Sequence, residues 1–156
     1  MSTIISKAKM LKKLAGLILC AILVSFSNVT GGGEGYEIYL NNKIVLQQYG
    51  SDMNVVKTLN LDKADGNDEL SLRYHHCGRI GKGRTISIKD GQDKVLKVWK
   101  FTDAAAGNRM GCKVKDILNL RKGKDNTLKL YYSSSELPNG RLLASIAAGT
   151  NPVSKL

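Results

Sequence analysis

The chain is poor in residues that interrupt strands and in residues that most hydrolases use for catalysis. Only two prolines and two histidines occur among 156 residues, and the histidines, His75 and His76, are adjacent. A serine or cysteine hydrolase needs a histidine beside its nucleophile and a third group that orients it. The G-x-S-x-G sequence is missing, and Ser133-Ser134-Ser135 is typical of the start of a turn. We therefore expect a protein that is not an enzyme.

The acidic residues and the glycine-rich loops do not indicate a cofactor site either. Most acids lie in turn sequences, such as residues 62–68 and 90–93, where turn chemistry explains them. Residues 62–68 also lack the residue order of a calcium loop. Residues 78–84 resemble a phosphate-binding loop only superficially, because the G-x-x-x-x-G-K-[ST] pattern is missing and a strand is expected to follow. We expect no cofactor.

Long hydrophobic runs are also scarce, and the clearest one lies near the N-terminus. Four lysines precede a mostly apolar run of 13 residues, 14 to 26, and small or polar residues follow it. A membrane-spanning helix needs roughly 20 apolar residues, whereas the apolar part of a signal peptide has about 7–15. We expect residues 1–27 to be a signal helix cleaved after Ser27, or alternatively after Gly31. A retained membrane anchor is the competing interpretation. The protein would then be secreted or periplasmic.

A positive charge remains after this leader is removed. Twenty Lys and Arg and thirteen Asp and Glu give the remaining chain a net charge of +7. Such an excess favours weak attraction to acidic surfaces, such as an anionic glycan or the cell envelope. Nucleic-acid binding would need aromatic residues on the same surface, and we expect Trp99 and Phe101 in the core instead. The expected partner is an unknown protein or an anionic glycan or envelope surface, not a nucleic acid.

Beyond a flexible Gly-rich lead-in at residues 28–35, short runs of alternating apolar and polar residues are separated by turns. Residues 36–40 and 43–49 flank Asn41-Asn42, a two-residue loop that tolerates positive φ and predicts a hairpin. The clearest alternation lies in residues 69–77, where Leu70, Leu72 and Tyr74 share one face. Further strands are expected at residues 54–61, 85–89, 95–101, 126–133 and 141–148, with a bulge or two-sided burial near Val98-Trp99.

About eight short strands at this spacing predict an all-β protein. We expect an antiparallel β-sandwich over residues 36–148, immunoglobulin-like or related, with a small barrel as the alternative. Residues 113–120 fit neither a strand nor a helical turn cleanly, and residues 149–156 are expected to form a short tail. No membrane span is expected once the leader is cleaved.

Two cysteines, Cys77 and Cys112, remain in the expected mature chain. An even number in an oxidising compartment predicts one disulfide, which would contribute roughly 3–4 kcal/mol by closing the intervening loop. The alternative is a copper or zinc site built from His75, Cys77, Met110 and Cys112. In an extended strand His76 points away from His75, so at most one of the two histidines would be a ligand.

Three cations lie among three glycines in residues 78–84, namely Arg79, Lys82 and Arg84. The backbone amides of such a loop can hold one anionic group, so these side chains are candidate anion contacts. A solubilising hairpin loop is the simpler interpretation. The sequence thus predicts an exported, non-catalytic binding or interaction module for an anionic or envelope partner. An exported copper- or zinc-binding protein is the alternative.

Overall fold

The computed structural model describes residues 33–61, 63–103, 109–121 and 127–147. The predicted leader 1–27, most of the lead-in and the predicted tail 149–156 lie outside the described residues. The chain divides into one unit of residues 1–32 and a second of residues 33–156, and only the second is described below. Within its described part, no helix is both long enough and apolar enough to cross a membrane.

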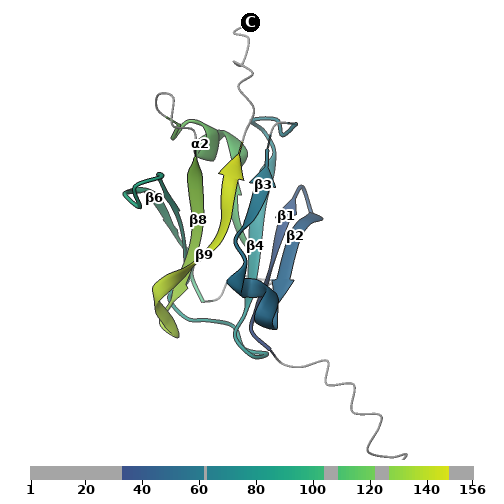
Figure 1. Ribbon diagram of the computed structural model, residues 1–156, viewed down its shortest axis with the longest axis vertical. Helices are drawn as coiled ribbons and strands as arrows, with labels where there is room; N and C mark the ends of the chain where they lie inside the picture. The colour runs from purple at the N-terminus through teal and green to yellow at the C-terminus, as the bar shows by residue number, and fades with distance from the viewer. Residues whose placement is uncertain (1–32, 62, 104–108, 122–126, 148–156) are drawn as a thin grey trace, which may run out of the picture. The chain divides into compact units, whose positions relative to one another are not determined.

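This second unit is an all-β fold of two sheets, as predicted (Figure 1). The four-stranded sheet has the order β2-β1-β4-β7, and the five-stranded sheet has the order β3-β9-β8-β5-β6. The strands are β1 (Gly35–Leu40), β2 (Lys43–Tyr49), β3 (Lys57–Asn60), β4 (Glu69–His75), β5 (Thr85–Lys89), β6 (Val95–Lys100), β7 (Met110–Lys113), β8 (Leu128–Ser134) and β9 (Leu137–Ala147). A 3₁₀ turn, η1 (Gly50–Asn54), and a short helix, α2 (Val114–Leu118), lie between strands.

The hairpin of β1 and β2 forms where the Asn-Asn pair predicted it. Asn41 and Asn42 both have positive φ, 48° and 68°, which is the backbone conformation of a type I′ turn. The Asn41 side chain also joins this turn to the start of β4. Its amide donates to Asp68 Oδ1 at 2.7 Å, and its carbonyl accepts from the Glu69 N–H at 3.0 Å. The turn is therefore stabilised by the tolerance of asparagine for positive φ and by the side-chain hydrogen bonds of Asn41.

The two sheets pack against each other around one apolar core, which gives a sandwich-like arrangement. Ile38 and Leu72 contribute to this core from the four-stranded sheet and Ile88 from the five-stranded sheet, each at most 1% exposed. Burying such a side chain stabilises the fold by about 1.5–3 kcal/mol. Between the sheets, the rings of Tyr74 on β4 and Tyr132 on β8 stack with centroids 4.2 Å apart. The alternation in β4 therefore predicted the buried face correctly.

The expectation of a purely antiparallel sandwich is wrong at one edge. β3 pairs in parallel with β9, with Lys57 opposite Ala144. β9 also starts at Leu137 rather than at residue 141, so Pro138 lies inside a strand. Proline is tolerated there because the β8–β9 register is irregular beside it, and β3 pairs with β9 only at residues 144–147. Residues 113–120 contain the end of β7 and the helix α2.

β6 is irregular, but earlier than expected. Its register against β5 shifts between Val95 and Lys97, so the bulge lies at Leu96 rather than near Val98-Trp99. Trp99 faces inward opposite Ile86, yet it is only partly buried. The reason is that β6 is an edge strand, which places the tryptophan at the margin of the core instead of inside it.

Candidate functional site

The predicted disulfide between Cys77 and Cys112 is not formed, and both thiols are free. Cys112 lies opposite Leu70 near the start of β4, whereas Cys77 follows the end of β4, seven positions further along the chain. At about 3.3 Å per residue, seven positions separate the two Cα atoms by roughly 20 Å or more. A disulfide needs Cα atoms within about 7 Å. The disulfide expected from an even cysteine count is therefore wrong, because Cys112 on β7 lies beside the start of β4 and Cys77 lies beyond its end.

The alternative metal site is not assembled either. His75 lies opposite Gly35 at one end of β4, while Met110 and Cys112 lie on β7 opposite Leu72 and Leu70. Among the residues that the structure describes, no group of three or more His, Cys, Asp or Glu could hold a metal ion. Burial raises the pKa of the Cys112 thiol to about 12, which disfavours the thiolate that a metal would require.

The three cations predicted as anion contacts do not form one surface. Arg79 and Lys82 are exposed, but Arg84 is only 2% exposed. The Arg84 guanidinium lies inside the fold, where its Nη2 donates to the Thr102 carbonyl at 3.0 Å. Arg84 therefore helps to hold the segment after β6 and is not an anion contact in the described fold.

The backbone amides of this loop already hold carboxylates of the same chain. The Lys82 N–H donates to both oxygens of Glu136, at 3.0 and 3.2 Å, and the Gly83 N–H donates to Asp103 Oδ1 at 2.9 Å. The hydrogen bond from Lys82 lowers the pKa of Glu136, so this carboxylate stays ionised. The amide cradle expected from the sequence thus exists, and internal carboxylates occupy it.

His76 makes an unexpected pair of contacts between the sheets. Its Nε2 lies 2.9 Å from the Tyr132 hydroxyl and 3.2 Å from Ser134 Oγ. A histidine beside a serine resembles half of a hydrolase site. Ser134, however, is buried, and Tyr132 covers the same ring nitrogen. The cluster therefore joins β4 to β8, and a substrate cannot reach the serine.

Glu37 is the centre of a second polar cluster, on the outer face of the four-stranded sheet. Its carboxylate accepts hydrogen bonds from the hydroxyls of Tyr39 and Tyr49, and it lies 3.7 Å from His75 Nε2 and 3.9 Å from Arg73 Nη1. Burial alone would raise the pKa of Glu37, but the two hydroxyls, together with His75 and Arg73, lower it. The carboxylate is therefore satisfied internally and serves to order this face.

The outer face of the five-stranded sheet is less completely neutralised. Lys89 on β5 lies directly opposite Lys129 on β8. Like charges that face each other across two strands destabilise a sheet. Such a pair needs compensating groups in the free protein, and it also attracts an external anion.

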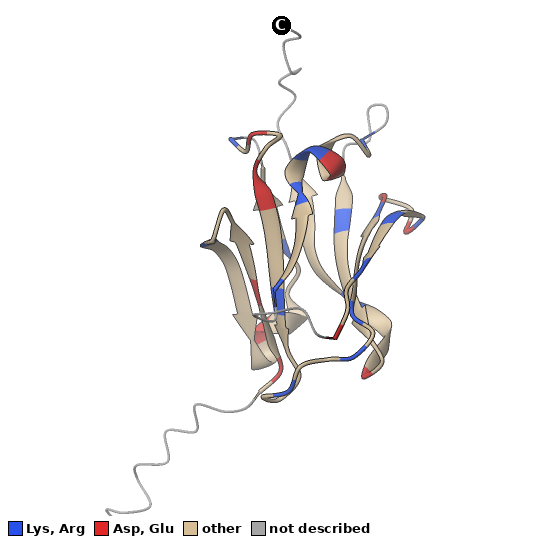
Figure 2. Cartoon of the chain, turned by 180° about the vertical axis from the view of Figure 1, so that it is seen from behind, with Lys and Arg blue, Asp and Glu red and all other residues tan. Residues whose placement is uncertain are grey.

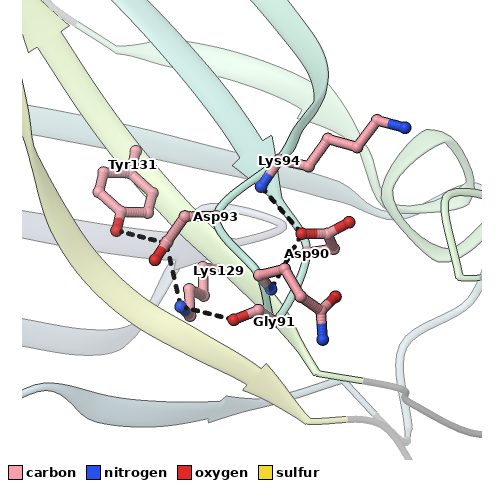
Figure 3. Close-up of polar contacts among 7 residues, drawn as sticks. Asp90, Gly91, Asp93, Lys94, Lys129 and Tyr131 are labelled. Atoms are coloured by element: carbon pink, nitrogen blue, oxygen red, sulfur yellow. Dashed lines mark hydrogen bonds and ion pairs between the residues drawn. The ribbon is translucent and has the colours of Figure 1, made fainter.

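Compensation comes from one turn carboxylate and one aromatic ring (Figure 3). Asp93 Oδ1 accepts from Lys129 Nζ at 3.0 Å and from the Tyr131 hydroxyl at 3.1 Å. The bond from Lys129 lowers the pKa of Asp93, and the same bond raises the pKa of Lys129. Lys89 instead places its Nζ over the Tyr131 ring, 3.9 Å from the centroid. Asp93 thus pairs directly with Lys129, while Lys89 makes a cation–π contact with the Tyr131 ring.

The turn that supplies Asp93 is itself ordered by hydrogen bonds. Asp90 Oδ1 accepts from the backbone N–H of Gln92 at 3.0 Å and from that of Lys94 at 2.9 Å. Asp93 adopts a positive φ of 64°, which acidic turn residues tolerate better than most side chains. These acids therefore have turn roles, as the sequence indicated, and one of them also positions the lysine–tyrosine cluster.

Beside this cluster the outer face carries a polar cavity of about 180 Å³. This hollow is open to solvent on one side and is bordered by strands β5 and β8 and by the β8–β9 hairpin. Its lining includes Ser87, Lys89, Tyr131, Ser133, Pro138 and Asn139. We call the cavity and its lysine–tyrosine neighbours the β5–β8 face.

A larger hollow of about 580 Å³ lies between the free edges of β2 and β3. It exposes Ile44 and Val45, 45% and 42% accessible. The bulge at Val45 and the exposed Lys57 are devices that protect sheet edges from pairing with other chains. We therefore take the β5–β8 face, and not this hollow, as the candidate site.

The positive residues as a whole are not gathered on one surface. Figure 2 shows Lys and Arg on strands and loops of both sheets, with Asp and Glu between them. What distinguishes the β5–β8 face is thus the opposed lysines and the cavity, not a local excess of cations. The sequence offered only a weak signal for it, because Ser87, Lys89, Tyr131 and Ser133 alternate with buried residues as any solvent-facing positions do. Comparisons with protein-family models, curated proteins and solved structures found no match to this chain.

Proposed function

We propose that this protein is an exported, non-catalytic binding module whose β5–β8 face contacts an anionic partner, an acidic glycan of the cell envelope or its surroundings. The observation that carries the proposal is the direct opposition of Lys89 and Lys129 on a solvent-facing sheet. Asp93 is the carboxylate that balances this lysine pair in the free protein, so a bound carboxylate would supply a second negative charge beside two cations.

A binding role is also supported by the surroundings of the histidines. His75 faces Glu37 on the outer face of one sheet, and His76 is held between Tyr132 and the buried Ser134. In the described part of the chain neither histidine has both a reachable nucleophile and an orienting acid, the arrangement that a hydrolase needs. These surroundings favour a proposal of binding over one of hydrolysis.

We further propose that the sandwich is immunoglobulin-like. Two features support this: β1, β4 and β7 are neighbours in one sheet, and β9, β8 and β5 are neighbours in the other. They would correspond to the A-B-E and G-F-C strands of that fold. Tyr74 on β4 and Tyr132 on β8 stack where antibody domains place the disulfide between strands B and F. An experimental structure with a different strand order would contradict this assignment.

Export is tested separately from binding. The full chain, expressed in a bacterial host, is expected to lose residues 1–27 and to accumulate outside the cytosol. N-terminal sequencing of the purified protein should then begin at Asn28, or at Gly32 for the alternative cleavage site. A chain that still begins at Met1 and stays in the cytosol would contradict the proposed export.

The binding proposal is tested with three double variants that each remove two cations. Lys89→Gln/Lys100→Gln alters the β5–β8 face, because Lys100 lies on the same side of the sheet opposite Thr85. The pair Arg79→Gln/Lys82→Gln alters the basic loop. The third pair, Lys43→Gln/Lys57→Gln, alters the distant β2 and β3 edges. Each is titrated calorimetrically with alginate, a carboxylated glycan, and with neutral dextran at 50 and 150 mM salt.

The wild-type protein is expected to bind alginate and not dextran, and the first variant should lose at least about tenfold in affinity, or 1.4 kcal/mol. The other two variants should lose no more than about threefold, because removing scattered charges weakens only long-range attraction. Equal losses in all three variants would mean that bulk charge drives binding. No alginate binding by the wild-type protein would overturn the proposed function.

A further inference from the structure

The cavity on the β5–β8 face has the lining of a ligand pocket and not that of a packing defect. Empty packing defects are apolar, whereas cavities that bind water or ligands carry polar groups. Here the residues that line a space of about 180 Å³ include Ser87, Ser133, Asn139 and Lys89, which carry two hydroxyls, one amide and one ammonium group. Pockets for drug-sized ligands are about 300–1,000 Å³. This one therefore suits a single small polar unit.

The floor of the cavity is rigid. Ser87 and Ser133 lie on neighbouring strands whose other face is the buried core, where Ile86, Ile88 and Tyr132 are at most 1% exposed. Ser133 Oγ is further fixed by a contact of 2.6 Å with Thr85 Oγ1. Polar groups on a paired strand lose little freedom when a ligand binds, which favours affinity for a small molecule.

The wall of the cavity depends on the β8–β9 hairpin. Gly140 has a φ of +70°, and a Cβ at this position would lie 3.1 Å from the Tyr132 carbonyl oxygen. Only glycine allows this close approach of the two hairpin strands without strain. The hairpin therefore keeps Pro138 and Asn139 beside the serines and Lys89, as the cavity requires.

The types of polar group indicate which ligand fits. Hydroxyl and amide groups both donate and accept hydrogen bonds, which matches sugar hydroxyls, whereas a sulfate ion offers acceptors only. One lysine supplies one positive charge, enough for a single carboxylate. The pyrrolidine ring of Pro138 adds an apolar surface for the C–H face of a ring. We propose that this cavity binds one uronic acid unit of an acidic glycan, with its carboxylate toward Lys89; the inference rests on the proposed function.

The test uses nuclear magnetic resonance titration of the isotope-labelled full chain, processed as the host leaves it. The ligands are the trimer of galacturonic acid, the neutral galactose trimer, and sodium sulfate. The uronate trimer should shift the backbone amides of Ser87, Lys89, Ser133, Asn139 and Gly140 with a Kd of about 1 mM, typical of one small unit. The neutral trimer should bind at least about tenfold more weakly, and sulfate should leave these amides unchanged.

Ser87→Val removes one hydroxyl and fills part of the cavity with a residue that strands accept. It should weaken uronate binding at least about tenfold, whereas Thr58→Val, an equivalent change on exposed β3, should leave it unchanged. Equal shifts with sulfate would show a simple anion site and overturn the inference, as would equal affinity for both trimers. If alginate still binds but the trimer does not shift these amides, the inference fails and the proposed function stands. If neither alginate nor the uronate trimer binds, both the inference and the proposed function are overturned.

Discussion

Replacing Tyr132 separates the contributions of its ring and of its hydroxyl to the stability of the contact between the sheets. This side chain is fully buried on β8; its ring stacks on Tyr74 of β4, and its hydroxyl lies 2.9 Å from His76 Nε2. Tyr132→Phe keeps the ring and removes one hydrogen bond, which should cost about 1 kcal/mol. His76 retains its contact with Ser134 at 3.2 Å, which limits the loss.

Tyr132→Leu also removes the aromatic pair, which adds about 0.5–1.5 kcal/mol and a loss of shape complementarity. A total of about 2–3 kcal/mol is expected. Urea unfolding measures both variants, and with a slope of about 1–3 kcal/mol per molar a loss of 1 kcal/mol lowers the midpoint by about 0.3–1 M. Tyr131→Phe, on the exposed face of the same strand, is the control and should change the midpoint less than Tyr132→Phe.

Two outcomes would refute this reasoning. Equal losses for Tyr132→Phe and Tyr132→Leu would mean that the stacked ring contributes nothing beyond its hydroxyl. A loss for Tyr131→Phe as large as that for Tyr132→Phe would mean that burial of the hydroxyl does not determine its contribution.

The remaining predictions concern the thiols and the acid side of the stability curve. A thiol reagent should label Cys77 rapidly in the native protein and Cys112 only after unfolding, because Cys77 is exposed and burial raises the pKa of Cys112 to about 12. Mass spectrometry measures the labelling. If the native Cys77→Ala variant is labelled as fast as the wild-type protein, the prediction is wrong. The pKa of Glu37 is lowered in the folded state, so its stabilising contribution is present above its unfolded pKa and is lost as pH falls through the folded value. Glu37→Gln should therefore make the free energy of unfolding fall less steeply between about pH 5 and pH 3. Urea unfolding at several pH values measures this. An unchanged pH dependence would mean that the contacts of Glu37 do not stabilise the fold.

Local patterns predicted the elements of the fold better than their partners. The Asn41-Asn42 pair determines its own turn geometry, and the alternation around Leu70 and Leu72 follows from one buried face, so both predictions are confirmed. The parallel pairing of β3 with β9 was missed, because nothing in residues 57–60 distinguishes a parallel neighbour from an antiparallel one. Strand partners are set by the whole arrangement and not by the strand itself.

The predicted sites failed for a related reason. The disulfide was inferred from a count of cysteines, and no property of the segments around Cys77 and Cys112 places them together. Arg84 was grouped with Arg79 and Lys82 because the three are close in sequence, but the chain turns into β5 at Arg84 and carries it inside. The opposed Lys89 and Lys129 are 40 positions apart, so only the register of β5 and β8 reveals them.

The position of β9 in its sheet bears on how the chain acquires its structure. β9 is the last of the described strands in sequence, yet it lies between β3 and β8, and residues 57–60 have no other neighbour among the described strands of that sheet. A nascent polypeptide that ends before residue 137 can form the early hairpin but leaves β3 unattached. Contacts this distant along the chain are slow to form. The five-stranded sheet therefore cannot be completed until residues 137–147 are available to pair with both β3 and β8.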